Sequence, residues 1–258
     1  MKSKTPLSAH PLASFEGPPT VYAVIPAGGV GNRLGADRPK QYLPVFGKKT
    51  MLEMSATILL EQDWIGKVVV VVAAEDGYQD AVFRGLNRRY GARVEFLLEG
   101  GATRRDTVLG GLQHLLNGQS KAASSWVLVH DAARPGLDRS SLERLRVAVL
   151  GDPKKTGGLL AMPLSDTVKQ VAGTGRAKEA RSAQTLDRRL LWAAQTPQMF
   201  SLKKLCAALQ TFNAVTDEAS AVEQAGGKPL LVMGSAQNFK VTTSDDLLLM
   251  RALLKAKR

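Results

Sequence analysis

The sequence predicts an α/β protein whose core is a doubly wound, mainly parallel β-sheet. Apolar runs of strand length alternate along the chain with helix-length stretches, and short connections join them. Several of these apolar runs contain no alternating polar residues, which is typical of parallel strands that helices cover on both faces. The chain has 258 residues, of which 44% are hydrophobic. That length fits one sizeable domain, and we expect residues 20–258 to form it.

The first half of the chain supplies three helices in this pattern, each between apolar runs. Thr50 and Glu53 form a candidate capping box, because their side chains can reciprocally satisfy unpaired amides at a helix start. Thr103 is a candidate cap for a later helix. The predicted strands are 21–26, 67–74, 93–98 and 126–135, the last ending in a polar loop, and the predicted helices are 50–62, 79–90 and 103–116.

The second half continues the alternation. Ser140 and Glu143 form a second candidate capping box, and Ser201 and Asp217 are candidate caps for two further helices. The last helix is expected to open at Ser244, where acidic residues suit the positive helix N-terminus. The predicted strands here are 157–163, 229–234 and 239–243.

Residues 165–194 break this rhythm. They are polar, rich in Arg and Lys, and show neither a helical period nor the character of a buried strand. A structureless loop of that length inside a compact domain is unusual, since loops beyond about 12–15 residues are uncommon. We interpret the segment as a protruding β-hairpin arm that packs against a partner subunit in a homodimer; the alternative is a solvated loop. Residues 1–19 are rich in proline and predicted to be a disordered leader.

Composition narrows the class of partner. The formal net charge of +12 and the pI of about 10.0 favour anionic ligands. The basic residues are dispersed and only 5% of residues are aromatic, so phosphorylated small molecules explain the charge better than nucleic acid. No apolar run approaches the ~18 residues of a membrane helix. A single cysteine, Cys206, excludes an internal disulfide, and we expect a cytoplasmic protein with no membrane partner.

A glycine-rich loop, PAGGVGNRLGADRPKQYL, follows the first strand at residues 26–43. Ligands of open parallel sheets bind beyond the carboxyl ends of the strands, where glycines let backbone amides approach phosphates. Arg33 and Lys40 add full positive charge, so the loop is predicted to hold a triphosphate. A dinucleotide-binding loop would require glycine at Leu34, and a P-loop would require glycine at Tyr42.

Five motifs then narrow the function. The loop itself resembles nucleotidyltransferases that make nucleotide-diphosphate sugars and polyols. Over about residues 21–254, the chain resembles the 2-C-methyl-D-erythritol 4-phosphate cytidylyltransferase family, on the ordered motifs PKQY (39–42), HDAARP (130–135), TPQMF (196–200), TDEAS (216–220) and NFKVT (238–242).

This resemblance implies a Rossmann-like fold and a reaction of the non-mevalonate isoprenoid pathway. CMP passes from CTP to 2-C-methyl-D-erythritol 4-phosphate, giving pyrophosphate and 4-diphosphocytidyl-2-C-methyl-D-erythritol. It also implies that Mg²⁺ is the cofactor, for which another divalent cation can substitute.

The resemblance also assigns roles to residues. Arg33, Lys40 and Lys240 are expected to be the catalytic cations. Asp131 is expected to bind both the metal and the acceptor, while His130 only shapes the loop. The implied nucleotide-binding residues are Ala27, Gly28, Gly29, Gly31, Gly101, Arg104, Asp106 and Thr107. The implied acceptor site consists of Asp131, Arg134, Thr167 and Arg188, the last two reaching the neighbouring subunit's site from the arm.

Other functions stay open. The family usually has alanine where this chain has Gly28, and glycine there is also seen in sister enzymes that make CDP-ribitol, so ribitol 5-phosphate is an alternative acceptor. A non-catalytic basic binding or regulatory module is an alternative of another class. An NAD-dependent dehydrogenase is disfavoured by the broken loop spacing and by the lack of a ribose-binding acid after a second strand.

Overall fold

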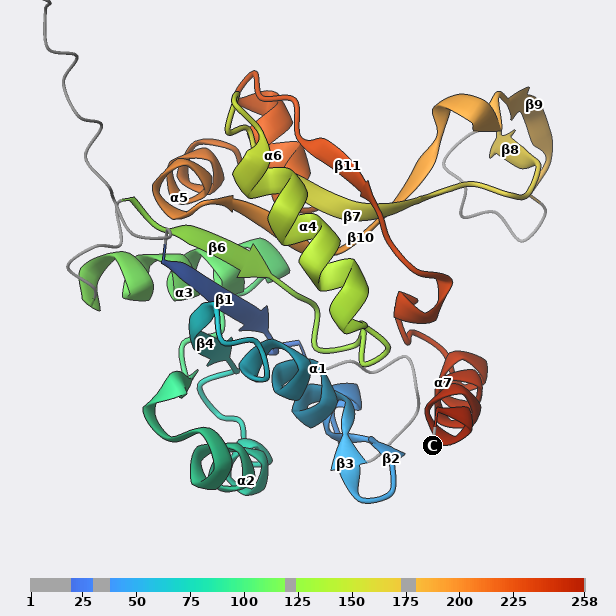
Figure 1. Cartoon of the computed structure of the whole chain (residues 1–258). Coiled ribbons are helices and arrows are strands. Elements are labelled where there is room, and N and C mark those ends of the chain that lie inside the picture. Colours follow the sequence, from blue (N-terminus) through green and yellow to red (C-terminus); the bar gives the residue numbers. More distant parts are fainter. Residues whose placement is uncertain (1–19, 30–37, 119–123, 173–179, 258) are drawn as a thin grey trace, which may run out of the picture.

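A mixed sheet forms the centre of the molecule (Figure 1). The structure is a computed structural model that describes residues 20–29, 38–118, 124–172 and 180–257. Within them, seven strands lie in the order β11–β7–β10–β6–β1–β4–β5. The strands are β1 (Val21–Pro26), β4 (Ile65–Val71), β5 (Val94–Leu97), β6 (Trp126–Val129), β7 (Gly158–Pro163), β10 (Trp192–Ser201) and β11 (Leu230–Met233). Neighbouring strands are parallel, except that β10 runs antiparallel to both β6 and β7. The predicted doubly wound, mainly parallel sheet is confirmed.

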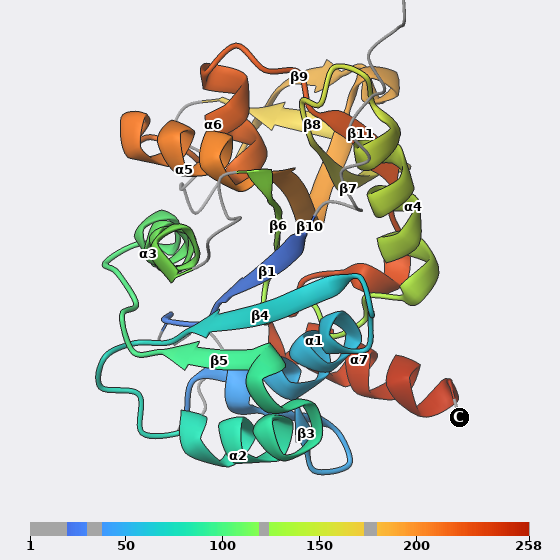
Figure 2. The same ribbon diagram turned by 60° about the vertical axis from the view of Figure 1, so that its left-hand side comes forward.

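Helices cover both faces of this sheet (Figure 2). One face packs against α1 (Met51–Leu60), α2 (Gln79–Tyr90) and α4 (Arg139–Gly151). The other packs against α3 (Arg104–Gly118), α5 (Leu202–Thr211) and α6 (Glu218–Gln224). In β1, Ala23 and Ile25 join the first core while Tyr22 and Val24 join the second. Burial on both faces is the reason that the run is apolar throughout.

A smaller core stands beside the sheet. The hairpin of β2 (Pro44–Phe46) and β3 (Lys49–Thr50) packs against α7 (Ser244–Ala256). The buried residues of this smaller core are Val45, Met51, Ala133, Val241, Met250 and Leu254. Ala133 belongs to the loop after β6, and Val241 to the segment before α7. The amide of Val241 donates to the Ala133 carbonyl at 2.8 Å. This packing brings Lys240 to the carboxyl end of β6.

Most predicted helix starts agree with the structure. The Thr50 hydroxyl accepts from the Glu53 amide at 3.1 Å, and Asp217 and Ser220 form a capping box at α6. The box predicted at Ser140 and Glu143 is wrong. Helix α4 begins at Arg139, and its cap is Asp138, whose carboxylate accepts from the Ser141 amide at 2.7 Å. That carboxylate also accepts from the hydroxyls of Ser140 and Ser141, so one acid satisfies several donors.

Two strand assignments also need correction. Residues 239–243 form no strand: the Thr242 amide bonds instead to the carboxylate of Asp246, which caps α7. Strand β10 was not predicted. Its centre carries three buried polar side chains, Gln195, Thr196 and Gln198, which hide a buried strand from a search for apolar runs. The remaining short 3-10 turns are η2 (Lys40–Tyr42), η3 (Gly91–Arg93), η5 (Arg188–Leu190) and η6 (Ala236–Asn238).

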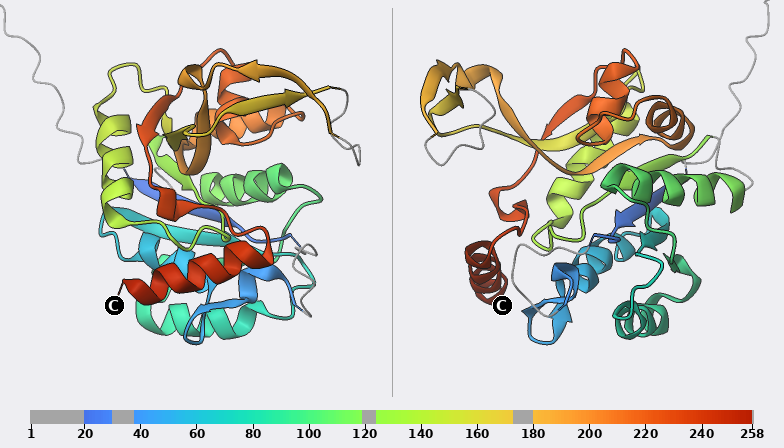
Figure 3. Two further views of the ribbon diagram at one scale, coloured as in Figure 1. Left: turned by 90° about the vertical axis from the view of Figure 1, so that its right-hand side faces the viewer. Right: turned by 180° about the vertical axis from the view of Figure 1, so that it is seen from behind.

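The predicted hairpin arm is present, although the last residues of its predicted range, 192–194, belong to β10 and pair with β7 in the central sheet. Strands β8 (Val168–Val171) and β9 (Ser182–Leu186) pair antiparallel with each other in a two-stranded sheet of their own. The hairpin extends away from the rest of the domain (Figure 3). The predicted leader, residues 1–19, lies outside the described residues. Among the helices that the structure describes, none is long and apolar enough to cross a membrane.

Candidate functional site

A cleft of about 560 Å³ lies at the carboxyl ends of β1 and β6. From β1 the chain first adds β4 and β5 on one side and then β6 on the other, so the order of strands reverses here. In doubly wound sheets this switch point is the usual place for a ligand. The cleft is lined by Pro26, Ala27, Gly28, Gly29, Lys40, Gln41, Gly101, Ala102, Thr103, Arg104, Thr107, Asp131, Ala132, Ala133, Lys240 and Thr242.

Gln41 holds the start of the glycine-rich loop. Its buried amide donates to the carbonyls of Ala27 at 2.7 Å and Gly29 at 3.1 Å. The Ala27 amide donates to the Val71 carbonyl of β4 at 2.7 Å, so this amide belongs to the sheet. Gln41 was not among the predicted site residues, although the PKQY motif contained it. Gly31 and Arg33, which were predicted to bind the triphosphate, lie outside the described residues.

Glycines let a second loop approach this one. A side-chain carbon added to Gly28 would lie 3.3 Å from the Cα of Gly100 and 3.4 Å from the Thr107 hydroxyl. One added to Gly101 would collide with Asp106. The Gly101 amide donates to the Thr107 hydroxyl at 3.1 Å. The structure therefore brings together Gly28, Gly101 and Thr107, three of the predicted nucleotide-binding residues.

Two lysines from opposite halves of the chain meet in the cleft. Lys40 comes from η2 after β1, and its ammonium donates to the Val241 carbonyl at 3.1 Å. Lys240 precedes α7, and its ammonium lies 2.8 Å from Oδ2 of Asp131. Both are predicted catalytic residues, and both line the cleft. Positive charge from two separate segments is thus concentrated at one place.

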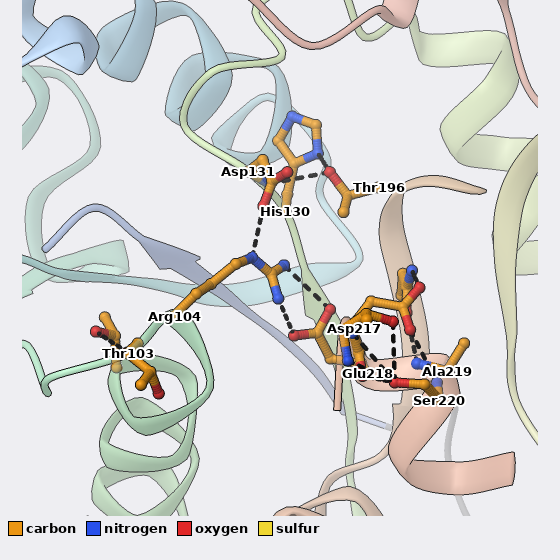
Figure 4. Close-up of polar contacts among 12 residues, drawn as sticks. Thr103, Arg104, His130, Asp131, Thr196, Asp217, Glu218, Ala219 and Ser220 are labelled. Carbon is orange, nitrogen blue, oxygen red and sulfur yellow. Dashed lines mark hydrogen bonds and ion pairs between the residues drawn. The ribbon is translucent and has the colours of Figure 1, made fainter. Parts of the chain in front are cut away.

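Asp131 stands among cations at the carboxyl end of β6, and Figure 4 shows one of them, Arg104. Its Oδ1 lies 2.9 Å from Nε of Arg104, and its Oδ2 lies 2.8 Å from Lys240 and 3.7 Å from Nε of Arg134. Burial by itself raises the pKa of this carboxyl, but the charges of Arg104 and Lys240 outweigh it and hold the pKa well below its usual range. Asp131 is therefore ionised near neutral pH.

Arg104 joins two carboxylates (Figure 4). Besides Asp131, its guanidinium binds Glu218 of α6, with Nη1 at 2.7 Å from Oε1 and Nη2 at 3.2 Å from Oε2. Burial lowers the pKa of Arg104, but the charges of Glu218 and Asp131 outweigh it and raise the pKa above its ordinary value. Glu218 is 1% exposed and was not predicted as a site residue. The TDEAS motif, which helped to carry the family resemblance, contained it, but no role was assigned to this residue.

His130 shapes the loop after β6 through hydrogen bonds, as expected. It is fully buried; its Nε2 lies 3.2 Å from the Arg134 carbonyl and its Nδ1 3.0 Å from the Thr196 hydroxyl. A carbonyl only accepts, so Nε2 carries the proton and Nδ1 accepts from Thr196. The Thr196 oxygen in turn accepts from the Asp131 amide at 3.0 Å. The neutral histidine therefore fixes the backbone at Asp131.

This arrangement predicts a specific dependence of stability on pH. Burial lowers the pKa of His130 to about 4, below the ordinary value of 6.5. Between these two pH values the unfolded chain binds a proton at this histidine that the folded chain does not. The contribution of neutral His130 to the free energy of unfolding is therefore complete above about pH 6.5. It is lost as the pH falls to about 4, by on the order of 3 kcal/mol. Urea unfolding of wild type and His130→Gln across this range tests it. The variant is expected to show a shallower slope; identical slopes would contradict the role of His130.

Four other predicted site residues do not line the cleft. Asp106 receives bonds from the Thr103 hydroxyl at 2.7 Å and from Arg105 at 2.6 Å, and its contact with the nucleotide stays a prediction. Arg134 donates to the Asn238 carbonyl at 2.7 Å beside Asp131. Thr167 and Arg188 lie exposed on the arm, where Arg188 donates to the Ser165 carbonyl.

No group of three or more His, Cys, Asp or Glu side chains suited to a metal ion occurs among residues 20–29, 38–118, 124–172 and 180–257. Asp131 alone supplies a carboxylate to the cleft lining that the structure describes. This fits Mg²⁺, which proteins often hold through one or two carboxylates together with substrate phosphates. It does not fit an ion held by protein ligands only.

Comparison with known proteins gives a consistent result. The family model described as 2-C-methyl-D-erythritol 4-phosphate cytidylyltransferase matches residues 21–256. A relative of that name from Pseudomonas fluorescens is 46% identical over 89% of this chain and 93% of its own. One from Laribacter hongkongensis is 45% identical over 90% of this chain and 95% of its own.

Solved structures agree. A 4-diphosphocytidyl-2C-methyl-D-erythritol synthase superposes with a TM-score of 0.77 at 38% identity, covering 92% of this chain and all of its own. The 2-C-methyl-D-erythritol 4-phosphate cytidylyltransferase of Francisella tularensis superposes with a TM-score of 0.71 at 31% identity, covering 89% of this chain and 97% of its own.

Proposed function

Since this chain belongs to the 2-C-methyl-D-erythritol 4-phosphate cytidylyltransferase family, we infer that its cleft joins CTP to 2-C-methyl-D-erythritol 4-phosphate. The enzyme transfers CMP from CTP to this acceptor and releases pyrophosphate and 4-diphosphocytidyl-2-C-methyl-D-erythritol. The observation that supports the location of the reaction is the meeting of Lys40, Asp131 and Lys240 in one cleft at the switch point of the sheet.

The chemistry calls for positive charge at this place. An oxygen of the acceptor phosphate attacks the α-phosphorus, the bond from that phosphorus to the bridging oxygen breaks, and pyrophosphate leaves with the electron pair. Both reactants are anions, and catalysis of such transfers rests on positioning and charge stabilisation. Lys40 and Lys240 are proposed to bind the triphosphate and the charge that develops on it. The amides of Gly28 and Gly29 are proposed to approach the phosphates.

We propose Mg²⁺ as the cofactor, with another divalent cation able to substitute. Asp131 would help to hold it, together with the substrate phosphates. The ion would supply further charge neutralisation at the phosphates. Chelation with EDTA is expected to abolish pyrophosphate release, and added Mg²⁺ to restore it. Full activity in excess EDTA would contradict a metal requirement.

The nucleotide end of the cleft bears on the choice of acceptor. A side chain at position 28 would point at Gly100 and Thr107, in the part of the cleft expected to bind the nucleotide. Glycine in place of the family's usual alanine at position 28 is therefore expected to affect nucleotide binding. It gives no support to ribitol 5-phosphate as the acceptor. Pyrophosphate release from CTP, measured in parallel with the two acceptors, tests this. We expect release with 2-C-methyl-D-erythritol 4-phosphate alone; release only with ribitol 5-phosphate would overturn the acceptor, and none with either would favour a binding module.

We further propose that the enzyme is a homodimer joined through the arm. The arm exposes two large apolar side chains, Val171 (38%) and Leu190 (81%), and Trp192 (37%) is exposed beside it at the start of β10. Thr167 and Arg188 lie on the same arm, exposed and apart from the cleft of their own chain. Contact with a second copy would cover the apolar side chains and bring these two residues to the partner's acceptor site.

Sedimentation velocity tests the dimer. The wild type is expected to sediment as a dimer, and Leu190→Glu to shift it toward monomer with lower activity, because a buried unpaired charge opposes association. A control change, Lys228→Glu, alters charge at an exposed residue away from the arm and is expected to leave the dimer intact. A wild type that sediments as a monomer with full activity would contradict the proposal.

A further inference from the structure

Glu218 is a buried acid at the cleft that the chemistry above does not use. It is the first residue of α6 and is 1% exposed. Both of its oxygens bind the guanidinium of Arg104, at 2.7 and 3.2 Å. Charged side chains are seldom buried to this extent without a partner that fixes them. The pair joins α6 to the segment that lines the nucleotide end of the cleft.

The backbone that carries Glu218 is anchored to the centre of the sheet. Gln198 of β10, itself buried, accepts from the Ala219 amide at 2.7 Å and donates to Asp217 at 2.8 Å. Asp217 and Ser220 close a capping box on the same turn. The carboxylate of Glu218 also suits the positive N-terminus of α6. Its position is therefore set by the sheet and does not depend on a bound substrate.

This anchoring is passed to Asp131 through Arg104. A two-pronged bond between guanidinium and carboxylate fixes the plane of the arginine. The Nε–H of the same guanidinium then points to Oδ1 of Asp131 at 2.9 Å (Figure 4). One rigid side chain thus connects α6 to the loop after β6.

We propose that Glu218 is a positioning residue for cytidylyl transfer, holding Arg104 against Asp131 so that the Asp131 carboxylate is oriented before the substrates bind. The proposal rests on the cytidylyltransferase function above. It concerns geometry, because Glu218 itself lies behind Arg104 and is hidden from solvent.

The charges of the cluster give the proposal a distinctive kinetic signature. Arg104, Arg134 and Lys240 surround Asp131, and Glu218 offsets part of their positive charge. Glu218→Gln keeps the shape but makes the cleft more positive, so the anionic substrates should bind at least as well. The orientation of Asp131 is lost, which is expected to lower kcat by about 10- to 100-fold. A merely loosened fold would instead raise KM.

A double-mutant cycle with Arg104→Gln tests whether Glu218 acts through Arg104. We expect Arg104→Gln to lower kcat, and Glu218→Gln added to it to change kcat by no more than about twofold, because coupled residues are non-additive. Losses in kcat that multiply in the double variant would overturn the proposal. So would a kcat of Glu218→Gln within a few-fold of wild type, or a raised KM for CTP as its main defect.

Three controls accompany the cycle. Glu143→Gln removes one carboxylate from an ion pair with Arg146 on the surface of α4 and is expected to keep wild-type kcat. Thermal unfolding tests whether each variant is folded. Glu218→Asp keeps the charge but shortens the side chain, and it is expected to lower kcat too. This variant replaces Glu218→Gln in the test if Glu218→Gln does not fold. Wild type is assayed alongside. An inactive wild type would remove the proposed function and with it this role, whereas an active wild type with unaffected variants would remove the role alone.

Discussion

Replacing Lys240 with alanine is expected to lower kcat by about 10²-fold or more, the usual cost of removing a group that stabilises transition-state charge. The Lys240 ammonium lies 2.8 Å from Asp131 and lines the cleft, so it stands where the acceptor and the α-phosphate are proposed to meet. Its removal also leaves Asp131 with less positive charge nearby, which makes the approach of two further anions harder. Steady-state pyrophosphate release from CTP and 2-C-methyl-D-erythritol 4-phosphate measures the effect.

Lys228→Ala is the matched control for this change. Lys228 is an exposed lysine that does not line the cleft, and its removal lowers the net charge by the same amount. We expect the control to keep nearly all of the wild-type kcat, because exposed charges are screened by salt. A kcat for Lys240→Ala within a few-fold of wild type would remove Lys240 from the catalytic residues.

Lys40→Ala is expected to have an effect of similar size, about 10²-fold on kcat, through the same loss of charge stabilisation. Lys40 reaches the cleft from a distant segment of the chain, in the η2 turn near the end of the glycine-rich loop. Its bond to the Val241 carbonyl connects that turn to the segment that carries Lys240. The change should therefore also loosen the approach of the two segments. The same pyrophosphate assay, read as kcat and KM separately, tests this.

The control here is Lys48→Ala, an exposed lysine in the turn between β2 and β3. It lies close to Lys40 in sequence but outside the cleft lining, so we expect normal turnover from it. If Lys40→Ala raised only KM and kept kcat, Lys40 would bind the ground state and the transition state equally, which would contradict a catalytic role.

Much of the fold could be predicted because the signals were local. An unbroken apolar run such as that of β1 indicates a strand covered on both faces, and a capping acid such as Asp217 marks a helix start. Strand β10 could not be predicted in this way, since its buried centre is polar and a search for apolar runs does not detect it. The cap at Asp138 was missed because a similar pattern followed two residues later.

The candidate site, like the fold, could be predicted from the sequence only in part. Motifs placed Lys40, Asp131 and Lys240 in one family pattern, and the structure brings all three to one cleft. The link from Glu218 through Arg104 to Asp131 could not be predicted, because it joins α6, the start of α3 and the loop after β6. Only the folded sheet brings these segments together. The sequence indicated a helix start at Asp217 and assigned no role to the neighbouring Glu218.

The most direct test of the site is a crystal structure of the protein with CTP, Mg²⁺ and no acceptor. The triphosphate is expected beside Gly28 and Gly29, with the α-phosphate within reach of Lys40 and Lys240 and the base near Gly101 and Thr107. CTP bound elsewhere on the molecule, with this cleft filled only by solvent, would contradict the assignment of the cleft as the site of cytidylyl transfer.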